Sequence, residues 1–376
     1  MTSQPPVSVV MPCFNAQRSV AAALDSILGQ SYPNLEVIAL DDGSTDSTRA
    51  ILECYALAHP GLRVLCAPVN HGLIATLNRG VREAGGDLIA RMDADDIAVP
   101  WRIARQVNAL TLRPEIGVVG SATRLVGVDG RRRLRPRPAR WLEPAGARFM
   151  AVLGTPFAHC TIVARRAVMR AHPYGAGSDS RHTEDYELFT RMLRAGVTFL
   201  NLDEPLMTVR VDPEGVSRRH EELQVANFLA CARRHLEQTI DMSPPPGALR
   251  VLVNRMGDTT SATDLAQGLR CLDRIEDTFV GREPAAAAEI RAVGDLQRVD
   301  ILTQAMLKGA PGARRAAIGL AVRYRRRILT PPARGYLQAK LASLAPRGVS
   351  LGRERAGPAP AIARTPAARH PAGPPA

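Results

Sequence analysis

Strand-like and helix-like segments alternate through the first hundred residues of this 376-residue chain. Short apolar runs with the length of buried strands lie at 7–12, 35–42, 62–68 and 87–93. Longer segments with helical spacing lie between them, at 19–30, 44–59 and about 73–84. This alternation predicts βαβ units, and therefore an α/β fold in which helices flank a parallel sheet.

Acidic residues stand at the carboxyl ends of two of these predicted strands. Asp41 and Asp42 end the second strand, and the stretch DADD places Asp93, Asp95 and Asp96 at the end of the fourth. Like charges this close repel one another and are costly to bury without a partner. Because ligands of open α/β sheets bind beyond the carboxyl ends of the strands, we expect these acids to line one crevice.

A divalent cation is one way to neutralise such a cluster. Residues two apart in an extended chain point to the same side, so Asp93 and Asp95 can face one ion. Mg²⁺ and Mn²⁺ prefer oxygen ligands, often one or two carboxylates together with substrate phosphates. The segment after the first strand, MPCFNAQRSV, has no glycine-rich phosphate loop. We therefore predict Mg²⁺ or Mn²⁺ as a cofactor, and a solvated acidic turn is the alternative.

The later segments have patterns of their own. The segment 116–126 predicts a hairpin strand, 157–171 predicts a strand that passes into a helix, and 183–196 predicts an amphipathic helix. Residues 225–330 are rich in Ala, Leu and Arg, and we expect them to be mostly helical. From Pro331 onward the composition shifts toward Pro, Ala, Gly and Arg, which is typical of disorder.

The net charge of +13 belongs to the end of the chain. Residues 1–215 carry 24 Arg and 22 acids, and residues 216–304 carry 11 Arg and 13 acids. Residues 305–376 hold 14 Lys or Arg against a single acid, Glu354. Aromatic residues make up only 4% of the chain, and the basic part has no recognition fold. A nucleic-acid-binding protein is therefore disfavoured, and we expect no nucleic-acid partner.

Three stretches together resemble the signature of family 2 glycosyltransferases. They are, in chain order, VSVVMPCFNAQRSVAAALDSILGQSYPNLEVIALDDGSTDST, NHGLIATLNRG and GGDLIARMDADDIAVPWRIARQ. The resemblance implies an inverting enzyme that uses a nucleoside-diphosphate sugar donor and has the GT-A fold, a Rossmann-like mixed sheet flanked by helices. It implies a catalytic domain at 1–215, which we expect to be followed by a helical C-terminal region at 216–330 and a disordered tail at 331–376.

The resemblance also implies roles for individual residues around the donor. Pro12 and Phe14 lie where the family's first loop meets the nucleobase and ribose. Asp42, in DDGS, resembles the carboxylate that accepts a hydrogen bond from the base. Asp93 is expected near the ribose, and Asp95 is expected on the metal ion.

The stretch HTEDYELFTRM resembles the family's acidic pair near the acceptor. Asp185 would be the general base, and Glu184 would lie on the acceptor side, as would His159 in TPFAHCTIV. A sugar hydroxyl is a poor nucleophile, so a carboxylate within hydrogen-bond reach can take its proton during the attack. The alternative for TED is a helix cap, because Thr and acids favour the first turn.

The sequence after Asp185 predicts which kind of glycosyltransferase this is. The processive members of the family carry a Gln-x-x-Arg-Trp motif after the acidic pair, but no Trp follows Asp185 here. A single-transfer enzyme is therefore favoured, and the Arg-rich, Ala-rich composition suggests a bacterial source. The family's closing segment is altered, because Val209 and Asp212 stand where Tyr and His are common beside Arg210.

The positive charge of the C-terminal part leads to expectations about the acceptor substrate and about where the protein is located in the cell. Residues 313–332 predict a basic amphipathic helix that could lie on an anionic membrane surface. We expect a glycan or glycolipid acceptor in cell-surface polysaccharide synthesis, and a cytoplasmic protein attached peripherally to the inner leaflet. The alternatives are a catalytically degenerate nucleotide-sugar-binding scaffold and a sugar nucleotidyltransferase, although the glycine-rich, lysine-containing first loop of the latter is absent.

Overall fold

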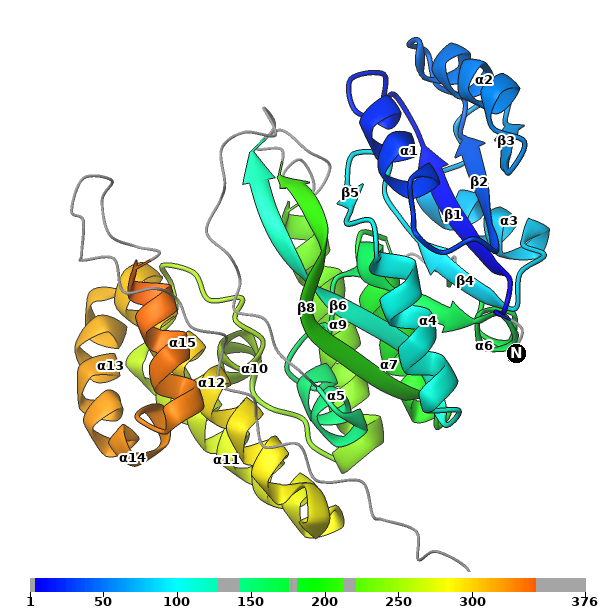
Figure 1. The fold of residues 1–376 in the computed structure, drawn as a ribbon. Coiled ribbons are helices and arrows are strands. Elements are labelled where there is room, and N and C mark those ends of the chain that lie inside the picture. The colour runs from blue at the N-terminus through cyan, green and yellow to red at the C-terminus, as the bar shows by residue number, and fades with distance from the viewer. Residues whose placement is uncertain (1–3, 128–141, 176, 178–180, 212–220, 343–376) are drawn as a thin grey trace, which may run out of the picture.

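The computed structural model describes residues 4–127, 142–175, 177, 181–211 and 221–342. An eight-stranded mixed sheet forms the α/β part of the molecule (Figure 1). In spatial order the strands are β3 (Leu62–Cys66), β2 (Leu35–Asp41), β1 (Val7–Cys13), β4 (Leu88–Arg91), β7 (Val163–Arg165), β6 (Ile116–Gly127), β8 (Thr198–Val211) and β5 (Ile97–Ala98). The predicted α/β fold with a mixed sheet is therefore confirmed.

The first four strands are all parallel, as the alternating pattern predicts. Their apolar runs are continuous because both faces of the sheet are covered. In β1, Val9 faces the core under one layer of helices, while Val10 faces the other. The helices of the first layer are α1 (Val20–Leu28), α2 (Thr48–Ala58) and α4 (Arg102–Leu112). Those of the second are α3 (Leu73–Glu83), α5 (Pro144–Ala151), α6 (Arg166–Ala171) and α7 (Glu184–Arg194).

The other half of the sheet mixes strand directions. β7 lies antiparallel to both β4 and β6, whereas β6 and β8 are parallel and form a long ribbon (Figure 1). The segment 116–126 is thus a strand, but the prediction of a hairpin there is wrong. The antiparallel partner of β6 is β7, which lies far downstream in the chain rather than across a tight turn.

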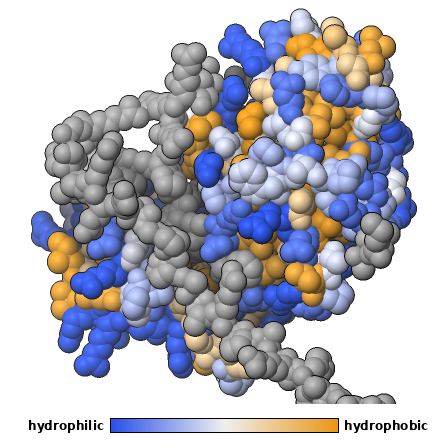
Figure 2. Space-filling view, viewed as in Figure 1, coloured by the Kyte–Doolittle hydropathy of each residue, from blue (hydrophilic) through white to orange (hydrophobic). Residues whose placement is uncertain are grey.

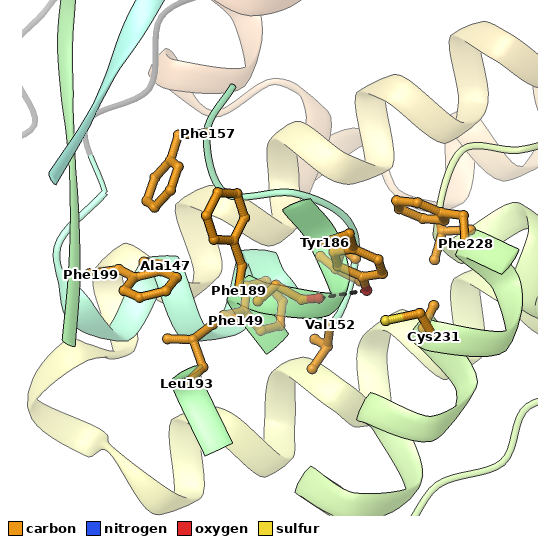
Figure 3. Close-up of a cluster of buried hydrophobic side chains, with 14 of the residues drawn as sticks. Ala147, Phe149, Val152, Phe157, Tyr186, Phe189, Leu193, Phe199, Phe228 and Cys231 are labelled. Carbon is orange, nitrogen blue, oxygen red and sulfur yellow. Dashed lines mark hydrogen bonds between the residues drawn. The ribbon is translucent and has the colours of Figure 1, made fainter. Parts of the chain in front are cut away.

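Aromatic side chains fix the start of α7 against its neighbours (Figure 3). The ring of Tyr186 stacks on Phe228 with 4.3 Å between centroids, and its hydroxyl donates to the Ala151 carbonyl at 2.8 Å. Phe189, one turn later, packs edge-on against Phe157 at 4.9 Å. These fully buried contacts hold the first turn of α7 rigidly, and that turn carries the predicted acidic pair.

The C-terminal region is helical, as predicted for residues 225–330. Its helices are α9 (Glu221–Ile240), α10 (Pro246–Leu252), α11 (Ala262–Arg282), η3 (Pro284–Ala286), α12 (Ala287–Lys308), α13 (Pro311–Arg323), α14 (Arg325–Ile328) and α15 (Pro331–Ala342). The apolar core under α5 and α7 continues into α9, α10, α11 and α12 without a break. The predicted boundary at residue 215 lies outside the described residues.

Two predictions about the C-terminal end need correction. Disorder from residue 331 is wrong for its first part, because residues 331–342 form α15, where Tyr336 and Lys340 both bond to Asp300. The rest of that tail lies outside the described residues. The single helix predicted over 313–332 is instead α13 and α14, separated at Tyr324. Within the described parts of the chain, no helix combines the length and apolar character needed to cross a bilayer.

Candidate active site

The sheet topology gathers distant segments at one edge. β2, β1 and β4 are parallel neighbours, so their carboxyl ends lie side by side. β7 runs antiparallel to β4, so the residues just before β7 arrive at the same edge. They form η1 (His159–Thr161), and the Arg91 amide donates to the Ile162 carbonyl at 3.0 Å. This arrangement places His159 and Cys160 beside the acidic stretch at 93–96.

Asp93, Asp96 and Cys160 form a compact group at this edge. One ligand-capable atom from each lies within 4.8 Å of the others. Asp96 is only 1% exposed, and its Oδ2 has no hydrogen-bond partner among the described residues. Burial, together with the charges of Asp93 and Asp95, raises the pKa of Asp96 well above its usual range. The Cys160 thiol and the Arg210 amide are donors to this carboxylate, which keeps one buried oxygen, Oδ2, without a close hydrogen bond among the described residues.

The two carboxylates of this group fit a divalent cation, whereas the thiol does not. Mg²⁺ and Mn²⁺ take oxygen ligands, and an ion between Asp93 and Asp96 would bind the oxygen that lacks a close hydrogen bond among the described residues. Burial and the charges of Asp96 and Asp93 raise the pKa of the Cys160 thiol well above its usual value. The thiol therefore stays protonated and is a poor ligand for a hard cation.

Asp95, the predicted metal ligand, is not a member of this group. Its side chain is exposed on one side, yet the surrounding protein and the charge of Asp93 raise its pKa to about 6. Asp93 itself is held by an ion pair with Arg91, with 2.5 Å between Oδ2 and Nη1. The metal-binding role of Asp95 stays a prediction, as does a ribose contact for Asp93.

Asp42 is buried and clamps a neighbouring loop. Its Oδ1 and Oδ2 accept hydrogen bonds from the amides of His71 and Gly72, both at 2.9 Å. The backbone at Gly43 packs closely against the backbone at Val69, because a Cβ on Gly43 would lie 2.5 Å from the Val69 carbonyl carbon. Gly43 also has a φ of 72°, which favours glycine. Asp42 thus shapes the start of α3, and its predicted contact with a nucleobase stays a prediction.

Phe14 is an exposed aromatic at the edge that Asp42 shares, with 48% of its surface accessible. Pro12, in β1, is only partly buried. The loop after Phe14 is bonded to the loop after Asp42, since the Asn15 amide donates to Ser44 Oγ at 3.0 Å. An exposed ring on a fixed loop is suited to stack against a flat ligand. The donor contacts of Pro12 and Phe14 stay predictions.

Glu184 and Asp185 lie in the first turn of α7 and are partly buried. Asp185 Oδ1 accepts a hydrogen bond from the Tyr186 amide at 2.7 Å, which fixes the orientation of the carboxylate. Burial raises the pKa of Asp185, and burial together with Asp185 raises the pKa of Glu184 to about 7. The cap at Thr183 makes no side-chain hydrogen bond to the helix, so its capping contribution is small.

His159 is buried and bonded to a residue that the sequence analysis did not single out. Its Nε2 lies 2.7 Å from the hydroxyl of Tyr174. Burial, with a smaller contribution from Arg91, lowers the pKa of His159 well below its usual value, so the imidazole is neutral. His159 therefore has a buried structural partner in Tyr174, and its acceptor-side role stays a prediction.

Arg91 is a buried cation that pairs with Asp93 and whose charge also reaches the other acids. It acts electrostatically on Asp95 and Asp96 of one acidic segment and on Glu184 and Asp185 of the other. The two acidic segments, about ninety residues apart in the chain, therefore lie close enough for their charges to interact with the same guanidinium group. Sequence reasoning missed Arg91, although a charged residue inside an apolar strand was a usable signal.

Arg102 and Gln106 were missed as well. Arg102 is completely buried, and its Nη2 donates to the carbonyls of Arg91 at 2.7 Å and Cys160 at 3.0 Å. Gln106, one turn later in α4, accepts from Arg102 and donates to the Thr161 carbonyl at 2.6 Å. This pair joins the two backbone segments that carry the acidic group. Their spacing on one face of a predicted helix was the available signal.

Comparisons with known proteins identify the family. Residues 8–171 match the model of glycosyl transferase family 2. The chain is 36% identical over 245 residues to EpsE of Bacillus subtilis, named as a glycosyltransferase, with 63% of this chain and 85% of that protein covered. It is 29% identical over 217 residues to AmsE of Erwinia amylovora, an amylovoran biosynthesis glycosyltransferase, with 56% and 79% covered.

Two solved structures share the fold. The mannosyltransferase PcManGT of Pyrobaculum calidifontis, in complex with GDP-Man and Mn²⁺, superposes with a TM-score of 0.50 at 22% identity, covering 91% of this chain and 86% of that one. TarS 1–349 of S. aureus, in complex with UDP-GlcNAc, gives a TM-score of 0.50 at 16% identity, covering 90% and 92%. With a mixed sheet that carries acids at its strand ends, the chain belongs to glycosyl transferase family 2 and has the GT-A fold.

Proposed function

We propose that this glycosyltransferase moves a single sugar from a nucleoside-diphosphate sugar to a hydroxyl of a glycan or glycolipid, with inversion at the anomeric carbon. The observation that carries the proposal is that two acidic segments, far apart in the chain, interact electrostatically with the same buried cation, Arg91. One segment, at 93–96, suits a cation and a diphosphate, and the other offers Asp185 as a base. A reaction between a charged donor and a neutral hydroxyl needs both.

In this proposal the donor lies along the strand ends. The ring of Phe14 stacks on the nucleobase, with Pro12 beside it, and Asp42 holds the loop that contacts the base. Asp93 and Asp96 would hold Mg²⁺ or Mn²⁺, with Asp95 available from the solvent side. A divalent cation held there would supply positive charge to stabilise the leaving diphosphate.

Asp185 carries the proton transfer. Its Oδ1 is fixed by the Tyr186 amide, so Oδ2 is the oxygen that takes the proton of the acceptor hydroxyl. The acceptor oxygen then bonds to the anomeric carbon while the bond to the diphosphate oxygen breaks on the opposite face. Burial raises the pKa of Asp185 toward the working pH, as suits a general base. Glu184 lies next to it on the acceptor side.

The relatives support the choice of substrates. PcManGT and TarS were crystallised with GDP-Man and UDP-GlcNAc, both nucleoside-diphosphate sugars, and PcManGT also with Mn²⁺. AmsE is named for the synthesis of a polysaccharide, amylovoran. We propose a role in cell-surface polysaccharide synthesis, with the enzyme on the cytoplasmic side of the membrane.

A donor panel tests the proposal. Binding of UDP-, GDP- and dTDP-sugars to the full chain is measured by calorimetry, with and without Mn²⁺. We expect one nucleotide class to bind at least about tenfold more tightly with the ion, because the ion links Asp93 and Asp96 to the diphosphate. If no sugar nucleotide bound more tightly with metal, the proposed donor site would be wrong.

Hydrolysis of the preferred donor, followed over hours without an acceptor, separates an enzyme from a degenerate scaffold. Slow release of the nucleoside diphosphate, lost in Asp185→Asn, is expected of an enzyme. A scaffold would bind the donor with the same metal dependence and release nothing. Retention of configuration in a sugar product would contradict the inverting mechanism.

A further inference from the structure

The basic side chains near the C-terminal end fall into two groups that the sequence alone does not separate. Residues 301–342 contain no Asp or Glu, so any acid that pairs with them comes from earlier in the chain. Arg327 turns inward and bonds to Glu276 and Asp295, both at 2.6 Å. Lys340 pairs with Asp300. These inward cations belong to the packing of the helices.

The second group points outward from α13 and α14. Its members share high exposure and the absence of a carboxylate within ion-pair distance in the described part of the chain. They are Arg314, Arg315, Arg323, Arg325 and Arg326. Five uncompensated guanidinium groups on two short consecutive helices create a strongly positive surface.

Large apolar side chains are exposed on the same two helices and directly after them. Ile318 and Val322, one turn apart on α13, are 62% and 60% exposed, and Leu329 is 54% exposed. Figure 2 shows apolar side chains beside strongly hydrophilic ones on the side of the molecule where α13 and α14 lie. We call these three side chains and the five arginines the α13–α14 face.

The α13–α14 face fits an anionic lipid bilayer. Exposed apolar side chains enter the boundary between headgroups and acyl chains, and arginines beside them bind lipid phosphates. In a symmetric dimer through this face, the same five arginines of two copies would face and repel one another, so a second copy of the chain is disfavoured as the partner. A nucleic acid would leave the apolar side chains in water, and the one aromatic residue between the helices, Tyr324, is buried.

We propose that the α13–α14 face docks the protein on an anionic membrane surface. The inference does not depend on glycosyl transfer, because none of its residues lies in the candidate active site. It differs from the sequence expectation for 313–332 in two ways. The face excludes Arg327, which is used inside the protein, and two helices rather than one form it.

Vesicle flotation of the full chain tests the proposal. The vesicles contain phosphatidylcholine alone or with about one third phosphatidylglycerol, a composition with an anionic surface. The variant R315Q/R323Q/R326Q removes three outward charges that make no backbone hydrogen bond within the described residues. R49Q/R82Q/R250Q is the charge-matched control, from exposed positions on α2, α3 and α10.

We expect the wild type to float with anionic vesicles and not with neutral ones. Each arginine near such a surface strengthens binding roughly fivefold, so the triple variant should bind about a hundredfold more weakly. The control should stay within a few-fold of the wild type. Equal flotation of the triple variant and the wild type would overturn the proposal, as would no flotation of the wild type.

Two further arms identify the partner and the segment. I318S/V322S should weaken vesicle binding about tenfold, because two apolar side chains no longer enter the bilayer. A short DNA duplex is the competing partner. If the protein bound the duplex as tightly as vesicles, and I318S/V322S did not weaken that binding, the proposal would be overturned. A chain that ends at Ala342 lacks the five arginines of 343–376 and should keep the difference between the triple variant and control. Donor binding, measured in every variant, separates this outcome from failure of the proposed function.

Discussion

Two regions of the molecule each contain a cluster of three acids. The clusters differ in whether all their carboxylate oxygens have hydrogen-bond partners. In the candidate active site, Asp93 of the acids at 93–96 pairs with Arg91, while Asp96 Oδ2 is buried without a hydrogen-bond partner among the described residues. In the C-terminal helices, three acids meet the two cations Arg298 and Arg327.

Every carboxylate oxygen of the second cluster is satisfied. Two oxygens bond to Arg298, two bond to Arg327, and the remaining two accept from the hydroxyls of Tyr324 and Thr330. The acids are Asp273, Glu276 and Asp295. The cluster links α11, α12 and α14, although Nε of the buried Arg298 has no hydrogen-bond partner among the described residues.

We interpret this difference as one between acids that hold the fold together and acids that we propose bind a ligand. A saturated cluster has already offset its desolvation with hydrogen bonds, so its loss costs stability. An undersaturated cluster keeps a repulsion that only a bound ion or a proton removes. Counting acids in the sequence does not distinguish the two, whereas counting partners in the structure does.

The largest expected effect concerns the acid assigned as base. Asp185→Asn should lower turnover about a thousandfold and leave donor affinity within twofold, because proton transfer is lost while the donor contacts remain. Single-turnover kinetics and calorimetry measure the two quantities. Glu187→Gln, on the same helix in an ion pair with Arg191, is the control and should keep its activity. A loss of donor affinity in Asp185→Asn would make Asp185 a structural residue.

The saturated cluster should respond in stability alone. Glu276→Gln should lower the free energy of unfolding by about 3 kcal/mol, because the buried guanidinium of Arg298 and the partly exposed one of Arg327 lose their shared charged partner. Urea unfolding measures this change, and donor affinity should not move. The matched control is Glu283→Gln, whose half-exposed pair with Arg148 is expected to contribute less than about 1 kcal/mol. If folded Glu276→Gln bound the donor more weakly than the wild type, the second cluster would affect ligand binding as well as stability, and the two clusters would not differ as proposed.

The undersaturated cluster should respond in ligand binding alone. Asp96→Asn should weaken donor binding in Mn²⁺ about thirtyfold, because one proposed cation ligand is lost. It should not lower the free energy of unfolding, since the repulsion from Asp93 and Asp95 disappears with the charge. Asp87→Asn, an exposed acid paired with Arg166, is the control. If donor binding by Asp96→Asn depended on Mn²⁺ as strongly as in the wild type, Asp96 would not be a ligand of the cation.

The smallest expected effect is a pH dependence away from both clusters. Glu289 accepts a hydrogen bond from the Glu143 amide at 2.7 Å, and burial raises its pKa from 4.5 to about 7. The folded state therefore binds its proton more tightly, and stability falls as the pH rises from about 4.5 to about 7.

Glu289→Gln has no proton to lose and keeps an acceptor for the Glu143 amide. Relative to the wild type it should gain about 1 kcal/mol between pH 5 and pH 8, after allowance for partial exposure. Urea unfolding at the two pH values measures the gain. A constant difference between the two proteins would mean that Glu289 titrates normally.

Local sequence patterns were enough to predict much of the fold and part of the candidate site. The strands β1 to β4 and the helices between them follow from runs and spacings that lie within a few residues of each other. Parallel strands share an edge, so the acids after β2 and β4 could be expected at one crevice from the sequence. The helix with Glu184 and Asp185 was predictable for the same local reason.

The partners of those residues were decided by the tertiary structure. Cys160 reaches Asp96 because β7 is antiparallel to β4, and Arg102 binds carbonyls from two segments that no local pattern connects. Arg327 lies in a run of arginines, yet it turns inward while its neighbours face water. Sequence periodicity encodes the elements and the side on which they are apolar. Compensation of a buried charge depends on atoms a few ångströms away, and these come from chain segments that only the folded molecule brings together.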